Sequence, residues 1–285
     1  MLLSVLSFSF MQLVVKLSAT HIGTMQQVFF RNLVCLVISA VVLSRNRVSF
    51  RGPKEYQGAL FLRSFFGFTG MVFLFAATAN ATQADVALLS RTTPIWVSFF
   101  AWLILKERID RVQIPVIALC MLGAVIAIRP SFDSDILPLI FALLTSVCSG
   151  IAYTMIARCK GAVNPWTVIF HFCTFSTVAA GILMIPTFII PSPKDLLMLF
   201  LIGVFGAGGQ MGLTYAMQNA PASEVSVYDY VGLPISALLG YLALDEKLTA
   251  TTLIGGLLII IGGVWSFLRD RLQKPTKARG ESRTS

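Results

Sequence analysis

Long apolar runs, separated by short polar connections, fill almost the whole chain. A helix needs roughly 20 apolar residues to cross the hydrocarbon layer of a membrane. Ten runs come close to that length or exceed it, at about 1–18, 25–44, 58–79, 85–105, 112–128, 136–157, 163–190, 195–218, 223–244 and 249–268. The sequence therefore predicts an all-α integral membrane protein with ten transmembrane helices.

The amino-acid composition agrees with this prediction. Of the 285 residues, 56% are hydrophobic and only 12% are charged, and the mean hydropathy is +0.81. A water-soluble core of this size cannot bury so much apolar surface while it presents so few charges to water. We therefore do not expect a cytosolic enzyme or a nucleic-acid-binding protein. The five cysteines lack close paired spacing, so we expect no disulfide framework and no metal site.

Lysine and arginine are distributed unevenly between the two sides that ten spans define. With the N-terminus in the cytoplasm, fifteen basic residues fall on the cytoplasmic side, whereas the other side holds only Arg129, Lys194 and Lys247. Because cytoplasmic connections carry an excess of lysine and arginine, we predict that both termini are cytoplasmic. The net charge of +9 then reflects topology and implies no nucleic-acid partner. The short connections favour a multi-pass protein of a bacterial inner (plasma) membrane.

The two halves of the chain resemble each other at a constant offset of 139 residues, for example in segments 105–109 (LKERI) and 244–248 (LDEKL). We predict a first repeat at 1–130, a second repeat at 131–268 and a basic tail at 269–285. Five is an odd number of spans, so the second repeat must enter the membrane upside down relative to the first. Inverted repeats are typical of secondary transporters, since the two halves can exchange inward-open and outward-open shapes.

The repeat unit resembles the EamA domain of the drug/metabolite transporter superfamily. The resemblance covers nearly the whole chain and rests on Phe30-Arg31-Asn32, the run from Phe75 to Asp85, Thr93-Pro94, Leu105-Lys106-Glu107 and their counterparts in the second half. It implies ten helices, cytoplasmic termini and a central cavity lined mainly by spans one, three, four, six, eight and nine. Members of the family transport amino acids, nucleotide-related metabolites, vitamins, organic anions and drugs.

Two arginines lie inside predicted spans at the same depth. Arg31 and Arg91 each fall about six residues from the outer end of a span, so their side chains start ~9 Å below the outer interface. Ionisable groups at such a depth usually face a partner or a water-filled cavity. The pair is a candidate clamp for a carboxylate or phosphate; the alternatives are snorkelling to the headgroups and a structural pair with Asp85. Arg63, near the cytoplasmic end of span three, is expected to snorkel.

An aspartate and a histidine are further candidate groups within the bilayer. Asp229 in span nine, with Tyr228 beside it, is a candidate acceptor for a cationic substrate group or a proton. The alternative for Asp229 is a pair with His171 or with an arginine of the first half. Histidine titrates near physiological pH, so His171 and Asp229 are candidates for proton coupling. The alternative for His171 is a hydrogen-bonded contact between helices.

Aromatic and amide side chains complete the predicted substrate pocket: Trp96, Tyr153, Gln210 and Tyr215. Pro94 and Pro234 occupy matching positions within their spans and are predicted hinges, because proline interrupts the hydrogen bonds of a helix. The glycines of span ten allow helices to approach closely, either within the chain or in a homodimer.

The expected function is secondary transport of a small polar or amphipathic organic metabolite, such as an amino acid or an organic anion, by alternating access. The alternative is a non-transporting multi-pass membrane subunit or receptor. We do not expect an enzyme, since the chain has two histidines far apart in sequence and no HExxH or GxSxG motif. No catalytic residue and no cofactor are assigned, and the predicted partners are the metabolite and membrane lipid.

Overall fold

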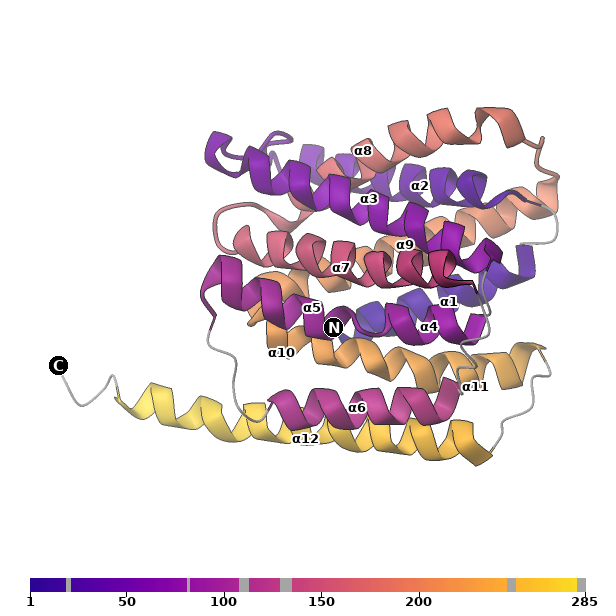
Figure 1. Ribbon diagram of the computed structural model, residues 1–285. Coiled ribbons are helices and arrows are strands. Elements are labelled where there is room, and N and C mark those ends of the chain that lie inside the picture. The colour runs from indigo at the N-terminus through magenta and orange to yellow at the C-terminus, as the bar shows by residue number, and fades with distance from the viewer. Residues whose placement is uncertain (19–21, 81–82, 108–112, 129–134, 245–249, 281–285) are drawn as a thin grey trace.

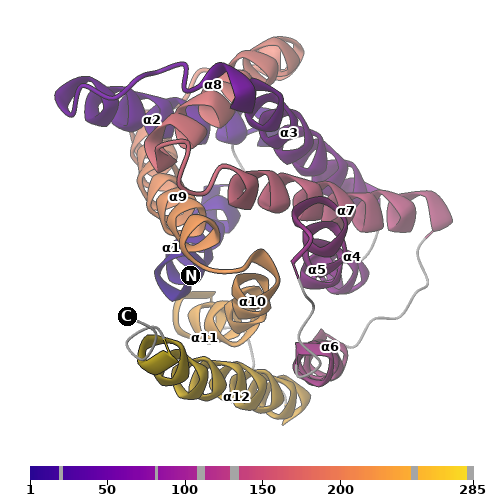
Figure 2. The same cartoon turned by 90° about the vertical axis from the view of Figure 1, so that its left-hand side faces the viewer.

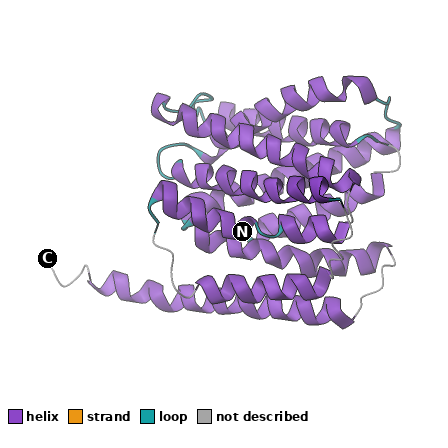
Figure 3. Ribbon diagram, in the orientation of Figure 1, coloured by secondary structure: helices purple, strands orange, loops and turns teal. Residues whose placement is uncertain are grey.

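The computed structural model describes residues 1–18, 22–80, 83–107, 113–128, 135–244 and 250–280, and every secondary-structure element in them is a helix (Figure 3). The elements are α1 (Leu2–Ser18), α2 (Thr24–Arg45), η1 (Lys54–Tyr56), α3 (Gln57–Asn80), α4 (Gln83–Ser90), α5 (Thr93–Phe100), η2 (Ala101–Leu105), α6 (Gln113–Ile128), α7 (Ile136–Arg158), α8 (Pro165–Met184), η3 (Ile185–Thr187), α9 (Pro193–Asn219), α10 (Ala222–Ser226), η4 (Val227–Val231), α11 (Gly232–Leu244) and α12 (Ala250–Gly280). The prediction of an all-helical protein is confirmed for these residues.

Seven stretches of the described helices are long and apolar enough to cross a membrane. Three shorter apolar helices lie at Leu2–Val15, Gln113–Ile128 and Leu253–Trp265. Large apolar side chains point outward from the bundle, such as Ile136 at 75% and Leu242 at 68% exposure. Such a surface is unfavourable in water but not in lipid. The protein is therefore a multi-pass membrane protein, whereas the count of ten spans stays a prediction.

The helices lie side by side along a roughly common direction, with the connections at the two ends of the bundle (Figure 1). Viewed along the helices, α2, α3 and α8 form one edge of the bundle, and α6 and α12 form the opposite edge (Figure 2). The most extensive contacts join α3 to α7, α2 to α8, α6 to α12 and α1 to α9. Each of these pairs joins a helix of the first half to a helix of the second half.

The glycines of α12 pack against α6 within the chain. A Cβ atom at Gly255 would collide with the carbonyl oxygen of Gly123, and one at Gly262 would lie 2.6 Å from Sγ of Cys120. The absence of side chains therefore lets these two helices approach each other closely. The glycines of span ten were predicted to allow close packing either within the chain or in a homodimer. The contact of α12 with α6 is packing within the chain, and a homodimer stays a prediction.

Two transmembrane segments are interrupted at corresponding places. The first break separates Ser90, the end of α4, from Thr93, the start of α5, and the second is the 3-10 helix η4 between α10 and α11. Pro94 and Pro234 each follow a break directly. Proline lacks an N–H group, and its ring clashes with the carbonyl four residues earlier. The Thr93 hydroxyl donates to the freed carbonyl of Ser90 at 2.8 Å, so the backbone stays satisfied inside the membrane. Breaks therefore occur at both predicted hinges, and hinge motion stays a prediction.

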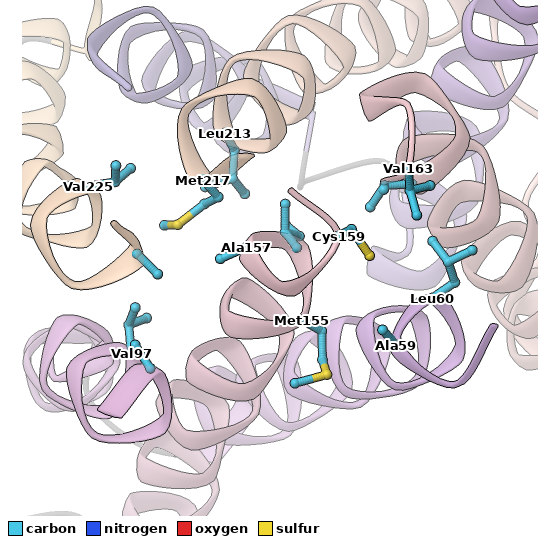
Figure 4. Packing of buried hydrophobic residues seen from close by; sticks show 14 residues of the cluster. Ala59, Leu60, Val97, Met155, Ala157, Cys159, Val163, Leu213, Met217 and Val225 are labelled. Carbon is cyan, nitrogen blue, oxygen red and sulfur yellow. The ribbon is translucent and has the colours of Figure 1, made fainter. Parts of the chain in front are cut away.

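A buried apolar cluster packs between helices of both halves (Figure 4). It includes Leu60 of α3, Val97 of α5, Met155 of α7 and Met217 of α9, each fully buried or nearly so. Leu60 lies near the start of α3, whereas Met155 and Met217 lie near the ends of their helices. These positions belong to the end that the lysine and arginine pattern assigns to the cytoplasm.

Candidate functional site

The two helix breaks meet through an arginine. Arg91 lies in the turn between α4 and α5, and its Nη1 donates to the backbone carbonyl oxygen of Asp229 in η4 at 2.8 Å. A Cβ atom at Gly232 would lie only 3.3 Å from that nitrogen, so the glycine makes room for the guanidinium. The charge of Arg91 also interacts with the Asp229 carboxylate. Of the alternatives considered for Asp229, the structure shows contact with an arginine of the first half.

Tyr153 of α7 lies at the centre of the charged groups. Its hydroxyl interacts electrostatically with Asp229 of η4, Arg63 of α3, Arg31 of α2 and Arg91 in the turn between α4 and α5. Tyr153, Arg91 and Asp229 lie deep among protein atoms, and yet each keeps part of its surface accessible. The structure thus brings together Arg31, Arg91, Tyr153 and Asp229, all of which the sequence analysis named as candidates. We call these four residues and Arg63 the central cluster.

Arg31 of α2 points between three other helices. Its guanidinium lies 5.7 Å from the centre of the Phe8 ring of α1, and Nη1 lies 4.0 Å from Sδ of Met71 in α3. On α9, a Cβ atom at Gly206 would lie 2.9 Å from Cγ of Arg31. The side chain is half-buried, and its Nε has no hydrogen-bond partner among the described residues. The contacts of Arg31 are therefore a ring face and a sulfur atom.

Arg63 was expected to snorkel to the cytoplasmic interface, and that expectation is wrong. Only 3% of its surface is exposed, and its guanidinium lies 4.2 Å from the centre of the Phe172 ring of α8. Gly67, one turn along α3, has no side chain and leaves space for Nη1. An arginine attracted to the face of an aromatic ring remains inside the protein. Arg63 was not predicted as a site residue, although Gly67, one helical turn away, indicated room for its side chain beside α3.

Four other predicted pocket residues take different positions. Tyr228 lies beside Asp229 and is half-buried. Gln210 is buried and its Nε2 donates within α9 to Oγ1 of Thr214 at 3.4 Å. Trp96 packs its Cβ against Gly150 of α7, and its ring lies against Phe99 and Phe100 of its own helix. Tyr215 is 41% exposed. The described contacts do not join Trp96, Gln210 or Tyr215 to the central cluster.

His171 lies outside the central cluster as well. Its Nε2 makes a 3.2 Å hydrogen bond with the backbone carbonyl oxygen of Arg51, in the connection between α2 and α3. The alternative considered for His171 was a hydrogen-bonded contact between helices; the hydrogen bond found here joins α8 to a connection instead. Proton coupling through this histidine stays untested.

A second contact between the two halves lies at the predicted cytoplasmic end. Oε1 of Glu107 accepts the backbone N–H of Ala222 at 3.3 Å, and Oε2 accepts the hydroxyl of Ser223 at 3.4 Å. Both donors lie at the start of α10, where a negative charge is favoured by the helix dipole. Glu107 belongs to the Leu105-Lys106-Glu107 motif, so this motif binds the first half to the second.

The described part of the chain contains no group of three or more metal-ligating side chains. The central cluster holds arginine, tyrosine and aspartate, and it lacks the histidine and cysteine ligands that transition metals favour. The arrangement is suited to binding a polar or charged small molecule, because guanidinium groups match the geometry of carboxylate and phosphate.

Comparisons with known proteins match almost the whole chain. The sequence profile of the EamA-like transporter family matches residues 1–129 and 136–268. The pseudopaline exporter CntI of Pseudomonas aeruginosa (strain UCBPP-PA14) is 29% identical over 264 residues, which cover 90% of each chain. Solute carrier family 35 member G1 of Homo sapiens is 25% identical over 95% of this chain and 79% of that protein. A solved crystal structure, 17% identical, shares the fold with a TM-score of 0.83 over 95% of this chain and 96% of the other.

Proposed function

Because the chain belongs to the EamA-like transporter family of the drug/metabolite transporter superfamily, we propose that it is a secondary transporter for a small organic metabolite with an acidic group. One observation supports an acidic group on the substrate: the central cluster contains three arginines and a single carboxylate, that of Asp229. Such an excess of positive charge inside a membrane protein is unfavourable unless an anion compensates it. An organic anion or a zwitterion such as an amino acid fits this requirement.

Alternating access requires two halves that exchange roles, and the helix contacts support an inverted repeat. In an inverted repeat, each segment of the first half has a counterpart in the second half, in chain order: α1 and α7, α2 and α8, α3 and α9, the α4–α5 and α10–α11 segments, and α6 and α12. Exchanging every segment for its counterpart turns the contact of α3 with α7 into the contact of α9 with α1, which the structure also has. The contacts of α2 with α8 and of α6 with α12 map onto themselves. Together with the three shorter apolar helices, this exchange favours ten spans in two five-helix repeats.

The transport site lies where the two broken segments meet, near Arg91 and Asp229. In secondary transporters, discontinuous helices expose backbone groups and helix ends to substrate and coupling ions near the middle of the bilayer. The accessible surface of Arg91, Tyr153 and Asp229, deep in the bundle, fits a polar cavity between the halves. Asp229 is the candidate for coupling to protons, or for receiving a cationic group of the substrate.

The described conformation is closed towards the cytoplasm in this proposal. The apolar cluster of Leu60, Met155 and Met217 fills that end, and Glu107 joins the first half to the start of α10 there. Both contacts must separate when the site opens inward. The orientation, with both termini cytoplasmic in a bacterial inner membrane, follows from the distribution of lysine and arginine.

The name of the pseudopaline exporter gives a substrate, whereas the name of the solute carrier gives none, so the two names do not select one substrate for this chain. What these two proteins carry is a property of those proteins. The substrate of this chain and its direction of transport are to be determined by experiment. No structural observation favours the receptor alternative.

The test begins with a thermal-shift screen of the purified protein against acidic metabolites, followed by flux of the hits into liposomes. Arg31→Gln and Arg91→Gln each remove a charged donor worth about 1.5–3 kcal/mol per hydrogen bond, so we expect flux to fall at least about tenfold. Arg158→Gln, at an exposed arginine at the end of α7, is the matched control and should transport normally. Unchanged flux in both central variants would remove the basis of the proposal.

A further inference from the structure

We infer that Arg31 and Arg63 together bind a doubly charged oxyanion, so that the substrate carries two negative charges. This inference rests on the proposed transport function and makes its substrate class narrower. It adds Arg63 to the proposed binding site. It also assigns the anion to Arg31 and Arg63 and not to Arg91, whose charge already interacts with Asp229.

Arg63 is a buried cation without an acceptor. Its side chain is 97% buried, and its Nε has no hydrogen-bond partner among the described residues. The groups that interact with its charge are Tyr153, Cys173, Arg31 and Cys159, none of them a carboxylate. A buried charge is strongly unfavourable unless it is paired and hydrogen-bonded. A bound anion would supply the negative partner that Arg63 lacks among these groups.

Arg31 has the same kind of surroundings. Its described contacts are the Phe8 ring and Sδ of Met71, and neither is an oxygen acceptor. The two guanidinium groups are close enough for their charges to interact. Cys173 lies near both charges and contacts Cys35, which lies near Arg31. The groups near the two arginines are thus thiols, the Tyr153 hydroxyl and apolar side chains, and none of them is a carboxylate.

Each guanidinium is held so that its donors stay available. Arg63 lies on the Phe172 ring and next to Gly67, and Arg31 lies near the Phe8 ring and next to Gly206. Aromatic rings attract guanidinium groups through their faces and fix the plane, but they accept none of the in-plane N–H bonds. Two fixed forks of this kind are suited to bidentate contacts with carboxylate or phosphate oxygens.

The charge balance sets the valence of the ligand. Arg91 donates to the backbone carbonyl oxygen of Asp229, and its charge interacts with that of the Asp229 carboxylate, so these two opposite charges offset each other. Arg31 and Arg63 leave two positive charges without a partner. A dicarboxylate and a phosphate monoester both supply two negative charges, and the experiment separates these two sources.

The first measurement is the thermal stability of the full-length protein in detergent without added ligand. Arg63→Met keeps the length of the side chain and removes the unpaired charge, so we expect the melting temperature to rise by about 2 °C or more. Arg158→Met, on the exposed end of α7, is the control and should leave it unchanged. A lower melting temperature for Arg63→Met would mean that Arg63 is structural, and would overturn the inference.

The second measurement uses probes of nearly equal shape and different charge. We expect succinate, or else glycerol 3-phosphate, to raise the melting temperature of the wild-type protein, while the singly charged succinamate has a smaller effect and neutral succinamide has none. Arg63→Met should lose the preference for the doubly charged probe, whereas Arg158→Met should keep it. Arg63→Lys keeps the positive charge but lacks the planar guanidinium that makes bidentate contacts. This variant should still prefer the doubly charged probe, with weaker binding. Equal effects of the charged probes, or no effect of any doubly charged probe, would overturn the inference.

The two proposals can fail separately. If liposome flux of an acidic metabolite depends on Arg31 and Arg91 but Arg63→Met retains the charge preference, transport stands and the role of Arg63 falls. If no acidic metabolite is transported while the doubly charged probes still bind through Arg63, the proposed transport function falls and the binding site stands.

Discussion

Replacing Arg91 with methionine should destabilise the protein, the opposite of the effect expected at Arg63. The hydrogen bond from Arg91 to the Asp229 carbonyl oxygen is 2.8 Å long and has a charged donor, which makes it worth about 1.5–3 kcal/mol. Its loss also leaves the Asp229 carboxylate with the N-terminal amino group of Met1 as its remaining positive neighbour, and removing one partner of a buried pair costs about 3–5 kcal/mol in total. Asp229 keeps some accessible surface, so we expect the lower end of this range, about 3 kcal/mol.

A double-mutant cycle with Asp229→Asn measures this coupling. Unfolding of the purified protein in detergent should show a large loss for Arg91→Met and a smaller loss for the double variant, because the second change removes the carboxylate that the first leaves unpaired. The coupling energy should be about 1–3 kcal/mol. Arg158→Met should stay within about 0.5 kcal/mol of the wild type. A neutral Arg91→Met, or purely additive effects, would refute the assignment of Arg91 and Asp229 as partners.

Three further predictions concern packing and the closed end. A Cβ atom at Gly150 would lie 2.6 Å from Cβ of Trp96, so Gly150→Leu should force α5 from α7 and lower stability by about 1–3 kcal/mol; an unchanged melting temperature would contradict this contact. Burial raises the pKa of the Cys159 thiol to about 11, so Cys159 should react slowly with maleimide at pH 7. When a transported substrate opens the cytoplasmic end, mass spectrometry should detect faster labelling of this thiol. Glu107→Ala removes a cap at Ala222 worth about 0.5–2 kcal/mol and should accelerate the labelling of Cys159 several-fold; slower labelling would mean that Glu107 does not hold this end closed.

The helical class and the helix breaks could be predicted from the sequence because each depends on local chemistry. Runs of about 20 apolar residues indicate spans by length alone, and Pro94 and Pro234 mark the breaks because proline cannot continue the hydrogen bonds of a helix. Arg31, Arg91 and Asp229 were named as candidates by a local argument, since ionisable groups inside a bilayer need partners, whereas Tyr153 was named by residue type.

The sequence could not give the rotation of each helix about its own axis. In a soluble protein the apolar stripe shows which face is inside, but here lipid surrounds the bundle and apolar side chains occupy both faces. Trp96 and Tyr215 were assigned to the pocket by residue type, yet Trp96 packs on Gly150 and Tyr215 is 41% exposed. Arg63 was misplaced for the same reason, because depth alone did not show that its side chain turns towards Phe172.

The central cluster separates two uses of a buried arginine. Arg91 contacts the chain itself, and in doing so it joins the breaks of two segments from opposite halves. Arg63 lies on a ring, and its Nε has no hydrogen-bond partner among the described residues. A ligand gains less from a charge that is already hydrogen-bonded, whereas an unpaired charge gains most when an anion arrives. An anion bound at Arg31 and Arg63 shifts the balance between conformations only by the difference between its affinities for them.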